Sequence, residues 1–316
     1  MSRELISIVV PVFNEAEVIT QTYGRLTAVA RAFEDLDYEL VVVDDGSRDA
    51  TYQTLARLAA KDERLKILKL SRNFGHQTAI TAGIDAAKGA CIVIIDADLQ
   101  DPPELIPQFI AKWREGFDVV YGVREEREGE STMKLLTASA FYRLLNRMTA
   151  VPIPVDVGDF RLMSRRVAER LKSMREKDRF VRGLVSWVGY PQTGVKYRRE
   201  ARAAGETKYP FRKMLKFAFD GLTGFSTVPL RLATWMGYFA SAFAFLYLIS
   251  VFVQKWMGET VQGWATIMVA LLFLGGVQLI CLGILGEYLG RVFNEVKHRP
   301  LYVIEDFVNG DPAGLG

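Results

Sequence analysis

The chain has 316 residues, of which 50% are hydrophobic, and its mean hydropathy is +0.10. This hydrophobic content is high for a purely soluble protein and predicts that part of the chain lies in a membrane. Forty basic residues against 37 acidic ones give a net charge of +3, a balance too even to indicate nucleic-acid binding. Two cysteines and two histidines are too few for a disulfide framework or for a zinc site built on histidine.

The first 100 residues alternate between strand-like and helix-like segments. Continuous apolar runs rich in β-branched residues predict strands buried on both faces, and the segments between them have helical spacing. The predicted strands are 5–12, 38–43, 65–70 and 92–95, and the predicted helices are 15–33, 49–61 and 77–87. Short connections favour a parallel, doubly wound α/β sheet that binds ligands at the carboxyl ends of its strands. The first apolar run is too short for a signal peptide, so we expect this domain in the cytoplasm.

Two carboxylates, Asp96 and Asp98, follow the fourth predicted strand. They share a face only if the backbone stays extended to that point. Carboxylate oxygens suit hard cations such as Mg²⁺ or Mn²⁺, whose shell is completed by phosphate oxygens and water. Such a pair can also simply end a strand. The polar pairs Asn14-Glu15 and Asp44-Asp45 at other strand ends favour a shared pocket instead.

Beyond residue 100 the pattern is less regular. Residues 155–163 place Asp156 and Asp159 beside Gly158, which predicts a tight turn before the next element. The other predictions are helices at 103–113 and 133–148, a strand at 118–121, a mobile loop over the pocket at 122–131, further elements at 180–187 and 195–199, and a flexible basic loop at 202–210.

The last third of the chain changes in composition. No charged residue lies between Arg231 and Lys255, or between Glu259 and Glu287, and each stretch exceeds the roughly 20 residues that span a bilayer. Basic residues flank the outer ends of the pair, so the positive-inside rule places both ends in the cytoplasm. Residues 211–225 have a basic amphipathic pattern that suits a membrane interface, or alternatively an ordinary surface helix.

These features predict four regions. They are a catalytic domain at 1–209, an amphipathic interfacial region at 210–230, two transmembrane helices at 231–290 and a cytoplasmic tail at 291–316. Glycines at 275–276 and 283–286 would allow close helix packing, either within the hairpin or between subunits of a homo-oligomer.

Five motifs, taken in order, resemble glycosyltransferase family 2. They are Pro11-Val12-Phe13-Asn14-Glu15, Asp44-Asp45-Gly46-Ser47, Ser71-Arg72-Asn73-Phe74-Gly75, Asp96-Ala97-Asp98-Leu99-Gln100-Asp101-Pro102-Pro103 and Gly158-Asp159-Phe160-Arg161. The match is closest to the polyprenyl-phosphate glycosyltransferases, and the two-helix tail extends it to the bacterial undecaprenyl-phosphate glucosyl branch. The resemblance implies a GT-A fold, a nucleotide-sugar donor, a divalent metal (Mg²⁺ or Mn²⁺) and inversion at the anomeric carbon.

The resemblance also implies roles for individual residues. Nucleotide-binding residues are Pro11, Phe13, Glu15, Asp44, Asp45, Asp96 and Ala97; metal-binding residues are Asp96, Asp98 and Gln100; catalytic residues are Asp98 and Asp159; and acceptor-phosphate residues are Arg124, Arg127, Arg161, Arg202 and Lys208. The Asp44 to Ser47 motif is equally typical of a plain turn with a helix cap. Because a phosphate nucleophile is largely dianionic at neutral pH, Asp159 either removes a proton or only orients groups and balances charge.

The implied reaction is hexose transfer from a nucleotide sugar to a polyprenyl phosphate at the cytoplasmic face of the membrane. UDP-glucose is the favoured donor because the two-span tail resembles that branch, and GDP-mannose or another nucleotide sugar is the alternative. A processive polysaccharide synthase is disfavoured, since the chain has no Gln-X-X-Arg-Trp motif. A non-catalytic nucleotide-sugar-binding scaffold in the membrane is the alternative from another class, and the intact Asp96, Asp98 and Asp159 argue against it.

Overall fold

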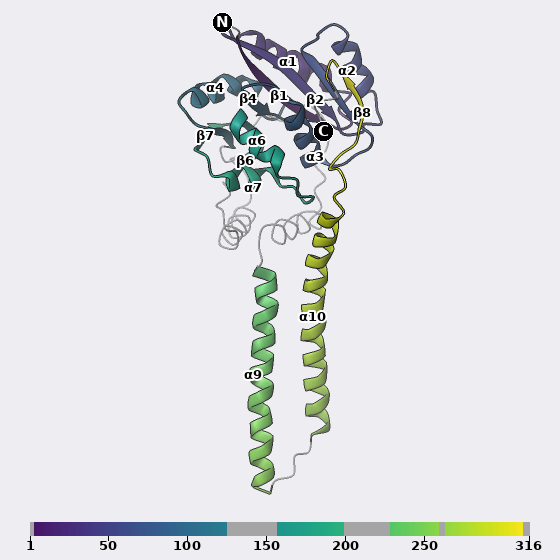
Figure 1. Cartoon of the computed structure of the whole chain (residues 1–316), viewed down its shortest axis with the longest axis vertical. Coiled ribbons are helices and arrows are strands. Elements are labelled where there is room, and N and C mark those ends of the chain that lie inside the picture. Colours follow the sequence, from purple (N-terminus) through teal and green to yellow (C-terminus); the bar gives the residue numbers. More distant parts are fainter. Residues whose placement is uncertain (1–2, 125–156, 199–227, 259–262, 312–316) are drawn as a thin grey trace. The chain divides into compact units, whose positions relative to one another are not determined.

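The computed structural model describes residues 3–124, 157–198, 228–258 and 263–311 (Figure 1). These residues form an α/β unit, which includes residues 299–311, and a helical unit within 228–298. The predicted loop at 125–131, the helix at 133–148, the basic loop at 202–210 and the amphipathic segment at 211–225 lie outside the described residues.

The α/β unit contains eight described strands and their helices. In chain order these are β1 (Glu4–Val12), α1 (Ile19–Arg31), β2 (Leu36–Asp44), α2 (Thr51–Ala59), β3 (Leu65–Leu70), α3 (His76–Ala86), β4 (Cys91–Ile94), η1 (Pro103–Leu105), α4 (Ile106–Arg114), β5 (Val119–Arg124), β6 (Val157–Ser164), α6 (Arg165–Ser173), α7 (Val181–Val188), β7 (Gln192–Tyr197) and β8 (Ile304–Val308).

The strands form one sheet in the order β7-β5-β6-β4-β1-β2-β3-β8. Strands β4, β1, β2 and β3 are parallel, whereas β6 is antiparallel to both β4 and β5, and β8 is antiparallel to β3. Side chains of α1, α2 and α4 pack with Ile6, Ile8 and Val10 on one face of the sheet. On the other face, Gly83 of α3 lies directly against Val9 and Val43. The predicted α/β fold with a mostly parallel sheet is therefore confirmed.

Two local predictions between residues 118 and 163 were wrong. Residues 122–124 extend β5, and Gly158 and Asp159 lie inside β6 and not in a tight turn. The reason is the alternation within β6: Phe160 belongs to the buried core and packs on Phe109, with ring centroids 4.7 Å apart. Asp159 and Arg161 consequently point to the opposite face of the strand.

Strand β8 was not predicted, because its five residues, Ile304–Val308, include two acidic ones. It pairs with the edge of β3, and the backbone N–H of Ser71 donates to the carbonyl of Val303 at 2.9 Å. Lys69 forms an ion pair with Glu305 at 2.8 Å. Residues 299–311 thus belong to the α/β unit.

Just after β8, Asn309 adopts a left-handed backbone conformation with φ of 54°. Its side-chain amide donates to the carbonyl oxygens of Ala59 and Leu65, at 3.0 Å each. These bonds connect the end of β8 to the end of α2 and the start of β3.

We expect Asn309→Ala to lower the free energy of unfolding by about 1 kcal/mol, because it removes these hydrogen bonds and because alanine tolerates positive φ less well than asparagine. Thermal unfolding of the full chain in detergent measures the effect. Asn309→Gly loses the same bonds without backbone strain, so its effect should be smaller. An unchanged unfolding midpoint in the alanine variant would contradict the anchoring role of Asn309.

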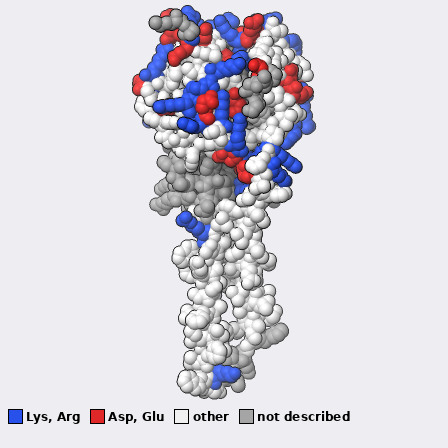
Figure 2. Space-filling model, viewed as in Figure 1, with Lys and Arg blue, Asp and Glu red and all other residues white. Residues whose placement is uncertain are grey.

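The helical unit consists of α9 (Val228–Trp256) and α10 (Trp264–Val296). Their apolar windows have mean hydropathies of 1.9 and 2.5, and none of the residues in these windows is buried. Charged side chains gather on the α/β unit, whereas the described surface of the long helices is almost entirely uncharged (Figure 2). The two helices therefore fit a transmembrane hairpin, as the sequence predicted.

Candidate donor and acceptor site

A pocket of about 230 Å³ lies at the carboxyl ends of β1, β2 and β4. Among the residues predicted from sequence, its lining contains Pro11, Phe13, Glu15, Asp45, Asp96, Ala97 and Asp98. The pocket lies where a parallel α/β sheet places its ligands. Asp44 does not line the pocket, because its buried carboxylate accepts the backbone N–H of Ser47 at 2.9 Å within the turn. The turn of the alternative interpretation is therefore present at Asp44, but the helix cap is not, since the N-cap of α2 is Ala50 without a side-chain hydrogen bond.

Asp45 organises the loop between β3 and α3. Its two carboxylate oxygens accept the backbone N–H groups of Phe74 at 2.7 Å and Gly75 at 2.9 Å. Burial raises the pKa of Asp45, although these two bonds oppose the shift. Gly46 has φ of 72°, and a Cβ there would meet the backbone of Arg72 and Asn73. The turn after β2 and the loop at 71–75 therefore fit together closely, and both border the pocket.

Asp96 and Asp98 both line the pocket, but not as alternate residues of a strand. Strand β4 ends at Ile94, the backbone turns at 97–98, and Leu99 has φ of 57°. The extended backbone that would place both carboxylates on one face by alternation is therefore absent. Asp98 instead bends back, and its Oδ1 accepts the backbone N–H of Gln100 at 3.2 Å. The turn at residues 97–98, and not the alternation of a strand, places both carboxylates at the pocket.

The chemistry of this pair fits a divalent cation. Within the described part of the chain, Asp96 Oδ1 is buried without a hydrogen bond, and His76 Nε2 lies 3.5 Å away. Burial raises the pKa of Asp96 to about 6, while the charge of His76 opposes the shift. No group of three or more histidine, cysteine or acidic side chains among the described residues has a metal-binding arrangement. A cation here would therefore need ligands from a substrate or from water.

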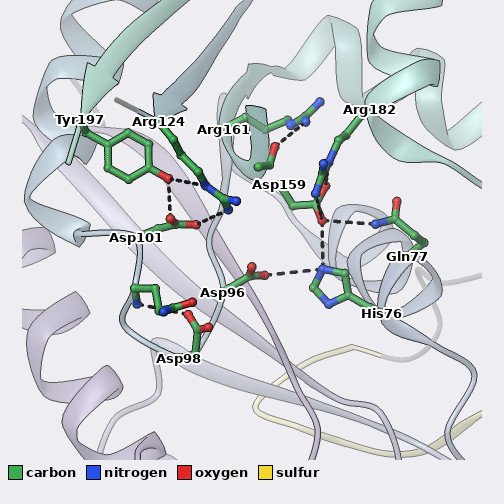
Figure 3. Close-up of polar contacts among 12 residues, drawn as sticks. His76, Gln77, Asp96, Asp98, Asp101, Arg124, Asp159, Arg161, Arg182 and Tyr197 are labelled. Carbon is green, nitrogen blue, oxygen red and sulfur yellow. Dashed lines mark hydrogen bonds and ion pairs between the residues drawn. The ribbon is translucent and has the colours of Figure 1, made fainter. Parts of the chain in front are cut away.

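Asp159 on β6 is the centre of a buried charge cluster (Figure 3). Arg182 on α7 donates to both of its oxygens, at 2.7 and 3.2 Å. Gln77 Nε2 donates at 3.3 Å, and His76 Nε2 lies at 3.1 Å. Burial alone would raise the pKa of Asp159, but bonds to His76 and Arg182 outweigh burial and hold it well below the usual range. The oxygens of Asp159 are thus already occupied by donors, and the group stays ionised.

Arg161 lies two residues along the same face of β6. It is 3% exposed, and its Nη2 donates to the carbonyl of Gly158 at 2.9 Å. Burial lowers its pKa to about 10, and the charge of Asp159 opposes that shift. Arg182 and His76 thus contact the Asp159 carboxylate directly, and Arg161 adds a further positive charge on the same face of β6, an arrangement that favours a further anion nearby.

The sequence analysis missed three members of this cluster: His76, Gln77 and Arg182. His76 and Gln77 follow directly after the Ser71 to Gly75 motif, so their place in the chain was an available signal. Arg182 lies in a short amphipathic helix, and no local pattern distinguishes it from a surface arginine.

The predicted acceptor residues are only partly described. Arg124 ends β5, and its Nε donates to the hydroxyl of Tyr197 at 3.3 Å. Arg161 belongs to the Asp159 cluster. Arg127, Arg202 and Lys208 lie outside the described residues, and Gln100 is buried beside the pocket without lining it.

If Asp159 anchors α7 through Arg182, Asp159→Asn should lower the free energy of unfolding by about 1–3 kcal/mol, because it leaves Arg182 without its charge partner. In an Arg182→Gln background, Asp159→Asn should lower the free energy of unfolding by less, since the ion pair between Asp159 and Arg182 is already broken. Chemical denaturation of the four proteins measures this coupling.

Asp118→Asn is the matched control. Asp118 is a buried carboxylate bound to Ser164 and Arg166 at the other end of β6 from Asp159. Asp118→Asn should change the free energy of unfolding by the same amount with and without Arg182→Gln. Additive effects of Asp159→Asn and Arg182→Gln would contradict the anchoring role.

Comparison with known proteins supports one family. Residues 7–172 match the description Glycosyl transferase family 2, and residues 228–292 match the GtrB C-terminal hairpin. The chain is 52% identical to the uncharacterized glycosyltransferase YkcC of Bacillus subtilis, over 96% of this chain and 95% of that protein. It is 43% identical to the bactoprenol glucosyl transferase of Shigella phage SfII, over 97% and 99% of the two chains. Since these matches extend over nearly the whole length, the chain belongs to glycosyltransferase family 2, with the C-terminal hairpin of the GtrB type.

Proposed function

We propose that this protein transfers a hexose, with glucose from UDP-glucose favoured, to a polyprenyl phosphate at the cytoplasmic face of the cytoplasmic membrane. The observation that carries the proposal is the position of His76, whose side chain lies close to both Asp96 and Asp159. Its Nε2 lies 3.5 Å from Asp96 in the donor pocket and 3.1 Å from Asp159 in the cationic cluster. A pocket for a nucleotide sugar and a cluster for a phosphate acceptor thus adjoin. The resemblance to bactoprenol glucosyl transferases supports the lipid acceptor.

The donor pocket suits a nucleoside diphosphate sugar. Phe13 is 41% exposed and lines the pocket, so its ring offers a surface for a base. The Glu15 and Asp45 carboxylates are acceptors for ribose hydroxyls or for a uracil N–H. Pro11 and Ala97 complete the wall, and Asp44 supports it from within the turn.

Asp96 and Asp98 are the proposed metal residues, with Gln100 as a neighbouring polar group. A bound Mg²⁺ or Mn²⁺ would neutralise the charge that develops on the departing nucleoside diphosphate. The buried Asp96 oxygen without a hydrogen bond is the feature of this chain that fits such a cation. The two carboxylates would supply only part of a coordination shell, and phosphate oxygens of the donor or water would supply the rest.

The acceptor phosphate needs little help to react. A phosphomonoester is largely dianionic at neutral pH, so one of its oxygens forms the new bond to the anomeric carbon as the bond to the diphosphate breaks. Inversion follows from attack on the face opposite the leaving group. Asp159, held ionised by Arg182 and His76, positions these cations and balances positive charge on the sugar. It is a positioning and charge-balancing group and not a proton acceptor.

Cations hold the acceptor. Among described residues, Arg161 and Arg124 are the proposed phosphate contacts, since a guanidinium fork suits phosphate oxygens. Arg127, Arg202 and Lys208 remain proposed contacts from the segments that follow β5 and β7. The apolar hairpin of α9 and α10 would keep the enzyme at the membrane, where a lipid-linked phosphate resides.

The test is transfer of radiolabelled sugar from a panel of nucleotide sugars to undecaprenyl phosphate in detergent, with Mn²⁺, Mg²⁺ or a chelator. We expect metal-dependent label in the lipid phase, strongest with UDP-glucose. Asp98→Asn should reduce the rate by on the order of 100-fold or more, while Asp37→Asn, an exposed carboxylate on β2, should not.

Label from GDP-mannose alone would change the assigned donor but keep the reaction. If nucleotide binds and no donor labels the lipid, the polyprenyl-phosphate assignment is wrong, and a nucleotide-sugar-binding scaffold becomes the better account.

A further inference from the structure

A second buried carboxylate, Asp101, lies apart from the Asp159 cluster, with Asp96 between the two in the view of Figure 3. It is fully buried, and one of its oxygens accepts a hydrogen bond from the hydroxyl of Tyr197. Its other oxygen lies 3.8 Å from Arg124 Nη2. Arg124 Nε also donates to the Tyr197 hydroxyl at 3.3 Å. Asp101, Tyr197 and Arg124 therefore form a closed triangle of contacts, called the Asp101 triad below.

The triad joins three separate segments. Asp101 belongs to the loop that carries Asp96 and Asp98, whereas Arg124 and Tyr197 are the last residues of β5 and β7. These two strands are parallel neighbours, and Arg124 pairs directly with Tyr197 in their register. One carboxylate thus fixes the ends of two strands against the proposed metal loop.

Two glycines make room for the triad. A Cβ on Gly122 would meet the ring of Tyr197 at 2.7 Å, and one on Gly158 would meet Arg124 Nη2 at 2.6 Å. The Tyr197 ring also lies edge-on to Phe160, with centroids 6.1 Å apart at 87°. The phenol is therefore held by packing on its ring and by hydrogen bonds at its hydroxyl. The Arg124 guanidinium lies over Gly158, the residue before Asp159.

The surroundings keep Tyr197 and Arg124 protonated, as their hydrogen bonds require. Burial and the neighbouring Asp101 raise the pKa of Tyr197 well above its usual range, so the phenol remains a donor. Burial lowers the pKa of Arg124, but its bond to Tyr197 and the charge of Asp101 outweigh burial and raise it. The Arg124 side chain is 32% exposed while the Asp101 side chain is fully buried. The Arg124 side chain therefore remains partly exposed.

We propose that Asp101 and Tyr197 are positioning residues that aim Arg124 at the phosphate of a prenyl-phosphate acceptor. This inference rests on the proposed function, because it assigns Arg124 to the acceptor. A guanidinium binds phosphate well only in a suitable orientation. Small errors in placing such a group cost large factors in rate or affinity. By sharing a loop with Asp96 and Asp98, Asp101 sets Arg124 relative to the donor's diphosphate.

The first test is direct binding of farnesyl phosphate to the full-length protein in detergent, without a donor, so that it does not depend on turnover. Tyr197→Phe removes only the hydroxyl that holds Arg124. We expect it to weaken binding on the order of tenfold, while UDP binding stays within twofold of wild type. Asp101→Asn should act in the same direction.

Tyr52→Phe is the matched control, since Tyr52 also donates its hydroxyl to a carboxylate, Asp306, and neither residue lines the pocket. It should change neither binding constant. A double-mutant cycle then tests whether Tyr197 acts through Arg124. In an Arg124→Ala background, Tyr197→Phe should have no further effect on farnesyl phosphate binding.

The inference would be overturned by unchanged farnesyl phosphate binding in Tyr197→Phe, by equal loss of farnesyl phosphate and UDP binding, or by an additive effect in the Arg124→Ala background. Absence of farnesyl phosphate binding to the wild-type protein would overturn it as well. Wild-type binding without sugar transfer would count against the proposed function alone, because the binding cycle still measures the triad.

Discussion

The buried charge of Asp159 is the constraint on which the site depends. An ionised carboxylate at 5% exposure is tolerated only when charges and hydrogen bonds compensate it. Arg182, His76 and Gln77 provide that compensation. Because these donors come from α7 and α3, their bonds hold both helices against β6. Helix α3 in turn follows the loop that Asp45 binds. The nucleotide end of the pocket is thus connected to the charge cluster through one short helix.

Asp159 and Asp96 therefore have different tasks: the Asp159 side chain is 6% exposed, whereas that of Asp96 is 25% exposed with one buried oxygen. Asp159 is saturated by donors and stays charged, whereas Asp96 has a buried oxygen without a hydrogen bond among the described residues and a raised pKa. The first arrangement suits a fixed counter-charge for neighbouring cations. The second suits a group that gains its partner when substrate and cation arrive. The two pKa values shift in opposite directions because the surroundings of the two side chains differ, although both residues are aspartates at the same end of the sheet.

Local sequence patterns predicted the parts of the fold that local patterns control. Uninterrupted apolar runs identified β1 to β4, and uncharged stretches identified α9 and α10. Strand β6 was misjudged around Gly158 because a Gly-Asp pair is typical of turns, whereas Phe160 belongs to the core. The partners of Asp159 and Asp101 could not be predicted, because Arg182 and Tyr197 are separated from them by 23 and 96 residues. Only tertiary packing brings those side chains together.

If Asp96 and Asp98 hold a divalent cation as proposed, phosphate oxygens of the donor's diphosphate would complete its coordination shell. Calorimetric titration of Mn²⁺ into the full-length protein, with and without saturating UDP, tests it most directly. With UDP the affinity should rise at least about tenfold, because phosphate oxygens complete the coordination shell, and Asp98→Asn should remove the gain. Equal Mn²⁺ affinity with and without UDP, or a gain that survives Asp98→Asn, would contradict the account.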